Sequence, residues 1–235
     1  MKIAMWSGPR NLSTAMMYAF GNRTDFAAWD EPFYAAYLAQ SGIDHPMRDA
    51  VLAAHETDPQ KVGDTCAGPV PHGKKHWYMK HMGFHMLDGF PLDWATDCVN
   101  IHLIRHPARV VASYAAKREN PTLDDIGFRQ QVEIYNRFPG PVIDSADIRR
   151  NPGEMLKKLC DIIGLNWNDA MLSWPAGVRS FDGAWAPHWY NAVHKSTGFA
   201  GAEGALPDLE GEARELCDAA LPYYEAMADK RIRLD

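Results

Sequence analysis

The sequence lacks the features that place a protein in a membrane, on nucleic acid or in an oxidising compartment. No apolar run approaches the length of a transmembrane helix, and the four apolar residues before Ser7 are too few for the apolar region of a signal peptide. Acidic residues outnumber basic ones, and the net charge of −6 disfavours a general nucleic-acid binder. The four cysteines are far apart and form no CxxC pair, which is typical of a reduced protein. We therefore expect a cytoplasmic protein without a membrane or nucleic-acid partner.

The sequence also lacks the Gly-Lys-Ser/Thr ending of a Walker A loop, although a related segment is present. Residues 7–14 follow a short apolar run and lead into a helical pattern over residues 15–20. A strand, a tight turn and a helix N-terminus present backbone N–H groups and partial positive charge to an anion. Arg10, Ser13 and Thr14 add side-chain donors to the same segment. The segment is therefore predicted to bind a phosphate group.

Short candidate strands alternate with helical patterns along the chain. The candidate strands are residues 2–6, 26–29, 77–80, 99–104 and 141–144, and the helical patterns are residues 14–21, 107–117, 123–138 and 152–163. This alternation predicts an α/β fold, with a parallel sheet flanked by helices. Ligands of such sheets bind at the carboxyl ends of the strands, which is where the phosphate-binding segment begins.

The remaining segments complete one predicted domain over residues 1–235. Residues 34–55 have a helical pattern, whereas residues 56–75 are rich in Gly, Pro, Asp and Lys and are predicted to form an exposed loop. Residues 174–207 form a long irregular segment with many aromatic side chains. It is either a functional lid or a plug at the edge of the sheet. Residues 208–230 are expected to contain a closing amphipathic helix.

A second candidate anion site follows the fourth strand. Arg105 falls at the carboxyl end of that strand, Pro107 suits the first turn of a helix, and Ser113 lies two turns into that helix. Arg105, at the end of a strand, and Ser113, in the following helix, can thus bind the same phosphate. The alternative is that Arg105 pairs with a surface carboxylate and that Ser113 has no ligand.

Together, the two segments resemble the sulfotransferase family, which uses 3′-phosphoadenosine 5′-phosphosulfate (PAPS). The family's 5′-phosphosulfate loop reads Pro-(Lys/Arg)-Ser-Gly-Thr-Thr, and the corresponding residues here are Pro9, Arg10, Asn11, Leu12, Ser13 and Thr14. The family's 3′-phosphate motif has an arginine, a proline two residues on and a serine eight residues on. Arg105, Pro107 and Ser113 keep that spacing. A strand ending at Asp144 and a helix from Pro152 match a third family segment, so the resemblance covers most of residues 1–165.

The resemblance implies a P-loop nucleoside triphosphate hydrolase-like fold, PAPS as co-substrate, a small-molecule acceptor and no required metal. It extends to a basic loop that closes over the 3′-phosphate, for which the candidates are Lys195, Ser196, Thr197 and Gly198. Asp30-Glu31-Pro32 is similar to a divergent sulfotransferase-like branch, some members of which carry a branched-chain aminotransferase-like label. Nothing in the sequence supports pyridoxal phosphate chemistry.

The sequence departs from the family pattern at two positions. Leu12 replaces the glycine of the phosphosulfate loop, and Ala15 stands where many members have an aromatic residue that stacks on adenine. An aromatic side chain from residues 185–199 is the candidate to hold adenine instead. These departures motivate one alternative, a non-catalytic nucleotide-binding relative. The other alternative is a P-loop kinase or ATPase, which the replacement of the Walker lysine by Arg10 disfavours.

Sulfuryl transfer needs positive charge at the leaving group and a base for the acceptor's proton. Arg10 is the candidate for the leaving group, with Lys80 assisting. Two residues compete as the base: Glu31, which follows the second strand, and His81, which follows the third. A salt bridge between Glu31 and Arg10 is the structural alternative. The histidine pairs at 81 and 85 and at 102 and 106 lack an evident third ligand, so we expect no metal site.

Overall fold

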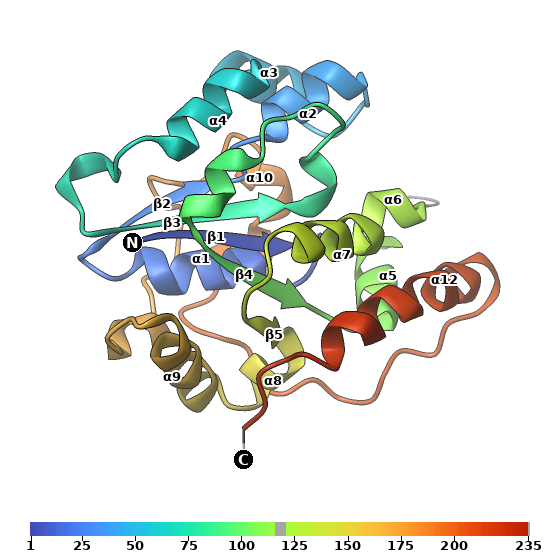
Figure 1. The fold of residues 1–235 in the computed structure, drawn as a ribbon. Coiled ribbons are helices and arrows are strands. Elements are labelled where there is room, and N and C mark those ends of the chain that lie inside the picture. The colour runs from blue at the N-terminus through green and yellow to red at the C-terminus, as the bar shows by residue number, and fades with distance from the viewer. Residues whose placement is uncertain (116–120, 235) are drawn as a thin grey trace.

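The computed structural model describes residues 1–115 and 121–234, and it contains a five-stranded parallel sheet flanked by helices (Figure 1). The strand order is β2-β3-β1-β4-β5, and every strand pair is parallel. The strands are β1 (Lys2–Ser7), β2 (Phe26–Asp30), β3 (His76–Met82), β4 (Val99–Ile104) and β5 (Val142–Asp144). The predicted α/β class is thus confirmed.

The central strand β1 has a core on each of its faces. Its residues are buried without interruption from Ile3 to Ser7, as expected for a parallel strand covered on both sides. Side chains alternate between the faces of a strand. Ile3 and Met5 pack with helices α1 (Ser13–Gly21) and α9 (Pro152–Ile163), whereas Ala4 and Trp6 pack with α4 (Pro59–Ala67) and α7 (Phe128–Arg137). In Figure 1, α1 and α9 accordingly lie on one side of the sheet and α4 lies on the other.

The other helices join and close these layers. They are α2 (Tyr34–Ser41), α3 (Arg48–Ala54), α5 (Pro107–Ala115), α6 (Leu123–Ile126), α8 (Ser145–Arg150), α10 (Ala186–Trp189), α11 (Asn191–His194) and α12 (Gly211–Ala228). Short 3-10 helices cover Pro71–Gly73, Gly83–His85, Asp93–Asp97 and Asp169–Leu172. Helix α12 packs against α5 and α7 and closes the domain, within the predicted range 208–230. Among the described residues, no helix combines the length and the apolar character needed to cross a membrane.

The structure corrects two predicted segments. Residues 56–75 are not an exposed loop, because they contain α4, which begins after Asp58 and buries Val62 and Cys66. The side chain of Asp58 caps the helix by accepting hydrogen bonds from the amides of Gln60 and Lys61. The helix predicted over residues 123–138 is two helices, α6 and α7. They are divided at Gly127, whose φ of 71° ends a helix.

Other boundaries shift by a few residues. Residues 34–55 form α2 and α3, and Gly42 ends α2 in the left-handed conformation. Strand β3 continues to Met82, two residues beyond its predicted end, and this places His81 inside the strand. The predicted helix 107–117 is seen as α5 to Ala115, and its residues 116 and 117 lie outside the described residues.

Candidate active site

A cavity of about 380 Å³ lies at the carboxyl ends of the central strands. Its walls come from the segment between β1 and α1, from the ends of β2 and β3, and from Arg105 after β4. Residues between 185 and 200 complete it. This is the edge of the sheet at which parallel α/β folds bind ligands.

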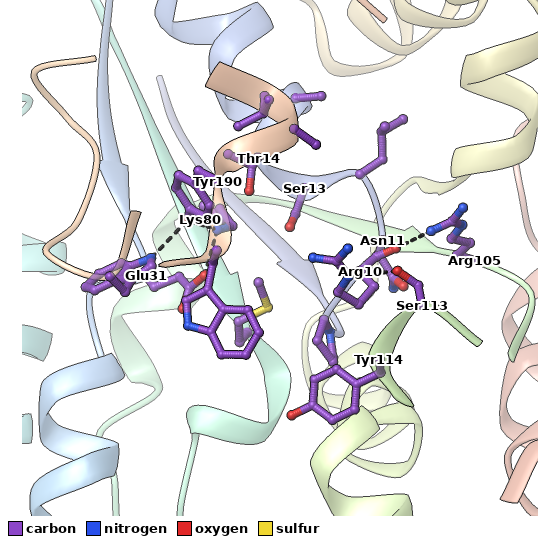
Figure 2. Close-up of a pocket in the computed structure, with 18 of the residues that line it drawn as sticks. Arg10, Asn11, Ser13, Thr14, Glu31, Lys80, Arg105, Ser113, Tyr114 and Tyr190 are labelled. Atoms are coloured by element: carbon purple, nitrogen blue, oxygen red, sulfur yellow. Dashed lines mark hydrogen bonds and ion pairs between the residues drawn. The ribbon is translucent and has the colours of Figure 1, made fainter. Parts of the chain in front are cut away.

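The two candidate anion motifs are joined by hydrogen bonds at one side of this cavity (Figure 2). The Nε of Arg10 donates to the Oγ of Ser113 at 2.8 Å. The Nη1 of Arg105 donates to the backbone carbonyl of Arg10 at 2.6 Å. Residues separated by more than ninety positions in the sequence therefore form one hydrogen-bonded unit.

The loop before α1 has a backbone conformation that most residues avoid. Arg10 has a φ of 61° and Leu12 a φ of 70°, both in the left-handed region that glycine adopts most readily. Leu12 therefore keeps a conformation suited to the glycine that it replaces. Such strain in non-glycine residues is concentrated at functional sites.

The N-terminus of α1 faces the cavity without a side-chain cap. Leu12 is its N-cap residue and supplies no side-chain hydrogen bond. The first-turn amides of Ser13 and Thr14 precede the first helical bond of α1, in which the amide of Met16 donates to the carbonyl of Leu12. This helix end carries partial positive charge and suits an anion.

Two contacts hold the loop in place. The side-chain amide of Asn11 donates to the carbonyl of Leu103 in β4 at 3.2 Å. Gly8 lies so close to α6 that a Cβ atom built on it would stand 2.7 Å from the carbonyl oxygen of Ile126. Pro9 lines the cavity between them. The loop is thus fixed to the sheet on one side and to α6 on the other.

Arg10 and Arg105 concentrate positive charge beside this loop. Burial lowers the pKa of Arg10, and the neighbouring charge of Arg105 lowers it further. Two guanidinium groups so placed favour an anion between or beside them.

The opposite side of the cavity holds a buried lysine with two carboxylates (Figure 2). The Nζ of Lys80 donates to Glu31 Oε1 at 2.6 Å, to Asp30 Oδ1 at 3.0 Å and to the hydroxyl of Tyr190 at 2.6 Å. Lys80 is completely buried, and Asp30 and Glu31 are nearly so. Glu31 therefore pairs with Lys80 and not with Arg10, the structural alternative considered from the sequence.

Burial and neighbouring charges act differently on the pKa values of Glu31 and Lys80 in this cluster. Burial raises the pKa of Glu31, the charge of Lys80 opposes that rise, and the charge of Asp30 adds to it. Burial alone would lower the pKa of Lys80, but attraction to Asp30 and Glu31 outweighs burial and raises it. Lys80 is therefore a fixed cation, and Glu31 is a carboxyl group whose raised pKa suits proton transfer.

Aromatic side chains also line the cavity. Trp185 packs edge-on against Tyr34 with ring centroids 5.0 Å apart, and its Nε1 donates to the hydroxyl of Tyr190 at 2.9 Å. Trp189 also lines the cavity, whereas Trp174 packs edge-on against Tyr18 of α1. The segment 174–207 is not wholly irregular, since it contains α10 and α11, and its aromatic residues both line the cavity and pack against α1.

The model of the family described as "Sulfotransferase domain" matches residues 1–231. The chain belongs to the sulfotransferase family.

Two curated relatives from Arabidopsis thaliana are similar over nearly the whole chain. The branched-chain-amino-acid aminotransferase-like proteins 2 and 1 are 35% and 36% identical to this chain over alignments of 231 residues that cover 96% of it. The chain spans only 41% of the length of either relative. The names of these relatives therefore describe proteins that are much longer than the region similar to this chain.

Solved sulfotransferase structures support the fold. One is the sulfotransferase from Alicyclobacillus acidocaldarius, with a TM-score of 0.53 and 10% identity over 98% of this chain and 96% of that one. Another is the sulfotransferase domain from the curacin biosynthetic pathway, with a TM-score of 0.50 and 14% identity over 92% and 96%. The sheet therefore has the P-loop nucleoside triphosphate hydrolase-like fold of sulfotransferases.

The structure separates the two base candidates of this sulfotransferase. Glu31 lines the cavity, whereas His81 does not. His81 points from β3 to the opposite face, between Trp6 and Trp94, with ring centroids 4.7 and 4.8 Å away. Burial lowers the pKa of His81 to about 3. The extension of β3 to Met82 causes this placement, because Lys80 and His81 alternate across the sheet.

A different histidine, His85, lies beside Glu31. Its ring is stacked between Tyr34 and Tyr37, with centroids 4.7 and 4.8 Å away. Its Nδ1 lies 3.9 Å from Glu31 Oε2 and has no hydrogen-bond partner among the described residues. Burial and nearby positive groups hold the pKa of His85 well below its usual range, so its ring is neutral.

The sequence left open that Arg105 pairs with a surface carboxylate. Arg105 does have a carboxylate partner, but the side chain of that partner is buried. Arg105 pairs with Glu203, whose carboxylate also lies 2.7 Å from Arg109 Nε and 2.8 Å from Arg149 Nη1. Three arginines therefore surround one side chain that is only 3% exposed. Arg109, Arg149 and Glu203 were not predicted from the sequence as site residues. The close spacing of Arg105 and Arg109, at the end of β4 and in the first turn of α5, was the available signal.

Of the four candidate residues in the basic loop after α11, two line the cavity and two do not. Ser196 and Gly198 line the cavity. Lys195 and Thr197 are exposed and are not among the lining residues. Ser196 is held by Trp174, whose Nε1 donates to its Oγ at 3.2 Å. The arginines around Glu203, more than Lys195, therefore supply the positive charge on this side of the protein.

No cluster of three or more His, Cys, Asp or Glu side chains in residues 1–115 and 121–234 is arranged to hold a metal ion. The histidines that are paired in the sequence have other partners in the structure. His81 and His85 pack among aromatic rings, and the Nε2 of His102 donates to the carbonyl of Phe138 at 2.9 Å.

Proposed function

We propose that this sulfotransferase moves a sulfuryl group from PAPS to a hydroxyl or amine of a small-molecule acceptor. The observation that carries the proposal is the hydrogen-bonded unit of Arg10, Ser113 and Arg105 at the wall of one cavity. It joins a phosphate-binding loop to a second anion site. A nucleotide phosphorylated at both its 5′ and 3′ positions matches such a pair of sites.

The loop side of the cavity suits the leaving group. PAPS, when bound, supplies an activated sulfuryl group on a phosphate leaving group. The uncapped N-terminus of α1 and the side chains of Ser13 and Thr14 offer hydrogen bonds to anionic oxygens. Arg10 adds a fixed positive charge, and it acts electrostatically because a guanidinium does not release its proton near neutral pH.

The lysine side of the cavity suits the acceptor. Glu31 takes the proton of the acceptor hydroxyl or amine, since its carboxylate lines the cavity and burial raises its pKa. Lys80 holds Glu31 in position at 2.6 Å and limits the rise of that pKa. Tyr190 fixes Lys80 from the other side at 2.6 Å.

The walls favour an acceptor with apolar or ring-shaped parts. Tyr34, Phe84 and Trp185 line the same cavity as Glu31. Trp189 lines it as well and is the candidate to stack on adenine, in place of the aromatic residue that Ala15 replaces.

The aminotransferase-like names of the Arabidopsis relatives suggest another chemistry, which this cavity does not favour. A lysine that forms a Schiff base must lose its proton. Lys80 is the buried lysine of the cavity, and its two carboxylate partners raise its pKa.

Turnover with PAPS and a panel of phenols, alcohols and amines tests the proposal. We expect release of 3′-phosphoadenosine 5′-phosphate (PAP) in equal amount to a sulfated product for at least one acceptor, without added Mg²⁺. A P-loop kinase or ATPase would instead consume ATP in an Mg²⁺-dependent reaction. A non-catalytic relative would bind PAP and release none from PAPS above the rate without protein. Either result would overturn the proposal.

A further inference from the structure

The carboxylate of Glu203 lies where the second anion site should receive a ligand. It belongs to the segment between Gly198 and α12, which has no regular secondary structure. Its ion-pair partners come from three separate elements: Arg105 follows β4, Arg109 is in α5, and Arg149 is in α8. The carboxylate of Glu203 therefore forms ion pairs with three guanidinium groups that converge on it.

The charge of this cluster is not balanced by Glu203. Three arginines carry three positive charges, and Glu203 supplies one negative charge. A phosphate monoester carries up to two negative charges and three acceptor oxygens, so it matches the cluster better than a carboxylate does. Attraction to Arg105 and Arg109 overcomes the effect of burial and lowers the pKa of Glu203, which keeps the side chain ionised at neutral pH.

The arginines also hold the backbone around Glu203. Arg149 Nε donates to the carbonyl of Gly201 at 2.8 Å, and Arg109 Nη2 donates to the carbonyl of Gly204. Residues 200–202 and 204–206 are exposed, in contrast to the buried carboxylate between them. A Cβ built on Gly201 or on Gly204 would meet no atom within 4 Å. Around Glu203, the segment is therefore attached to the domain chiefly through the three arginines, and a phosphate would bind the same guanidinium groups.

The same segment borders the nucleotide cavity. Ala200, three residues before Glu203, lines the cavity, and so does Arg105. Arg105 is thus shared: its Nη1 binds the carbonyl of Arg10 in the phosphate loop, and its Nη2 binds Glu203. A ligand phosphate that approaches Arg105 from the cavity meets the Glu203 carboxylate on the same guanidinium.

We propose that Glu203 is an internal substitute for the 3′-phosphate of the nucleotide, and that residues 200–206 release the three arginines when a 3′-phosphorylated nucleotide binds. The inference rests on the proposed function, because it takes the second anion site as the 3′-phosphate site. Glu203 then sets the affinity for the nucleotide, since binding must first displace a carboxylate. The observed affinity is the intrinsic affinity reduced by the fraction of molecules in which the arginines are free.

Titration calorimetry of Glu203→Gln tests this displacement. Glutamine keeps the size of the side chain and removes its charge. Because the hydrogen bonds of arginine to a carboxylate are stronger than those to a neutral amide, PAP should bind the variant about ten- to a hundredfold more tightly than the wild type. AMP, which has no 3′-phosphate, should bind both proteins equally. Glu203→Asp keeps the charge on a shorter side chain and should give an intermediate affinity for PAP.

The controls separate this inference from the proposed function. Glu210→Gln removes a charge from an exposed position at the start of α12 and should leave the affinity for PAP unchanged. If the wild type prefers PAP to AMP but neither Glu203 variant binds PAP more tightly, Glu203 is not a phosphate substitute and the inference is wrong. If neither the wild type nor Glu203→Gln prefers PAP to AMP, the proposed function itself fails.

Discussion

Replacement of Lys80 by methionine tests how the buried cluster is held together. The change removes an ammonium group with no exposed surface and keeps a side chain of similar length. Two buried carboxylates, Asp30 and Glu31, then lose a partner at 3.0 and 2.6 Å. Breaking a buried ion pair on one side costs about 3–5 kcal/mol, so we expect the free energy of unfolding to fall by that amount at pH 8.

The loss of stability should depend on pH. Without Lys80, burial raises the pKa of Glu31 in the folded protein further above its unfolded value. A carboxyl group with a raised folded pKa stabilises the fold when protonated, and this stability is lost as the pH rises through that pKa. The difference between Lys80→Met and wild type should therefore be smaller at pH 5 than at pH 8. A second change, Glu31→Gln, should restore part of the stability at pH 8.

Urea denaturation followed by circular dichroism measures these differences. The matched control is Lys61→Met, because Lys61 and Glu56 form an exposed pair at 3.7 Å. Its loss should cost less than about 1 kcal/mol. The description of the cluster is refuted if Lys80→Met costs no more than this control, or if adding Glu31→Gln destabilises the variant further at pH 8.

Three further predictions concern catalysis, the loop and donor choice. Glu31→Gln should lower kcat by about 10²- to 10⁴-fold with little change in PAP affinity, and a kcat within about tenfold of wild type would remove Glu31 as the base. Gly8→Ala should cost about 1–3 kcal/mol in urea denaturation, because its Cβ would stand 2.7 Å from the carbonyl of Ile126. Gly153→Ala in α9, where the nearest atoms are 3.9 Å away, is the control, and equal effects would contradict the close packing of the loop. Arg105→Ala should lose the preference for PAP over AMP, as measured by calorimetry, and a preserved preference would move the 3′-phosphate site elsewhere.

The sequence predicted the sheet and the loop because both depend on local order. An apolar run, a turn and a helical pattern are contiguous in residues 2–20, and they became β1, the loop and α1. Helix α4 was missed because its composition is that of a loop. Only the Asp58-Pro59 start and the spacing of Val62 and Cys66 indicate a helix.

The parts of the site that the sequence did not predict depend on tertiary placement. The side on which Lys80 and His81 point depends on where β3 ends, and a shift of two residues decides whether His81 follows the strand or lies inside it. Glu203 lies 98 residues from Arg105 and 54 from Arg149, so no local pattern connects them. The family resemblance, and not spacing alone, predicted that the loop at residues 9–14 and the motif of Arg105 and Ser113 serve one nucleotide.

The most direct test of the central claim is the affinity of the wild-type protein for PAP and for AMP, measured by titration calorimetry without Mg²⁺. The cavity joins a phosphate-binding loop to a second anion site through Arg10, Ser113 and Arg105. The account predicts that PAP binds at least about tenfold more tightly than AMP, since the 3′-phosphate gains charged hydrogen bonds. Equal affinity for the two nucleotides in both the wild type and Glu203→Gln, or no binding of PAP, would contradict it.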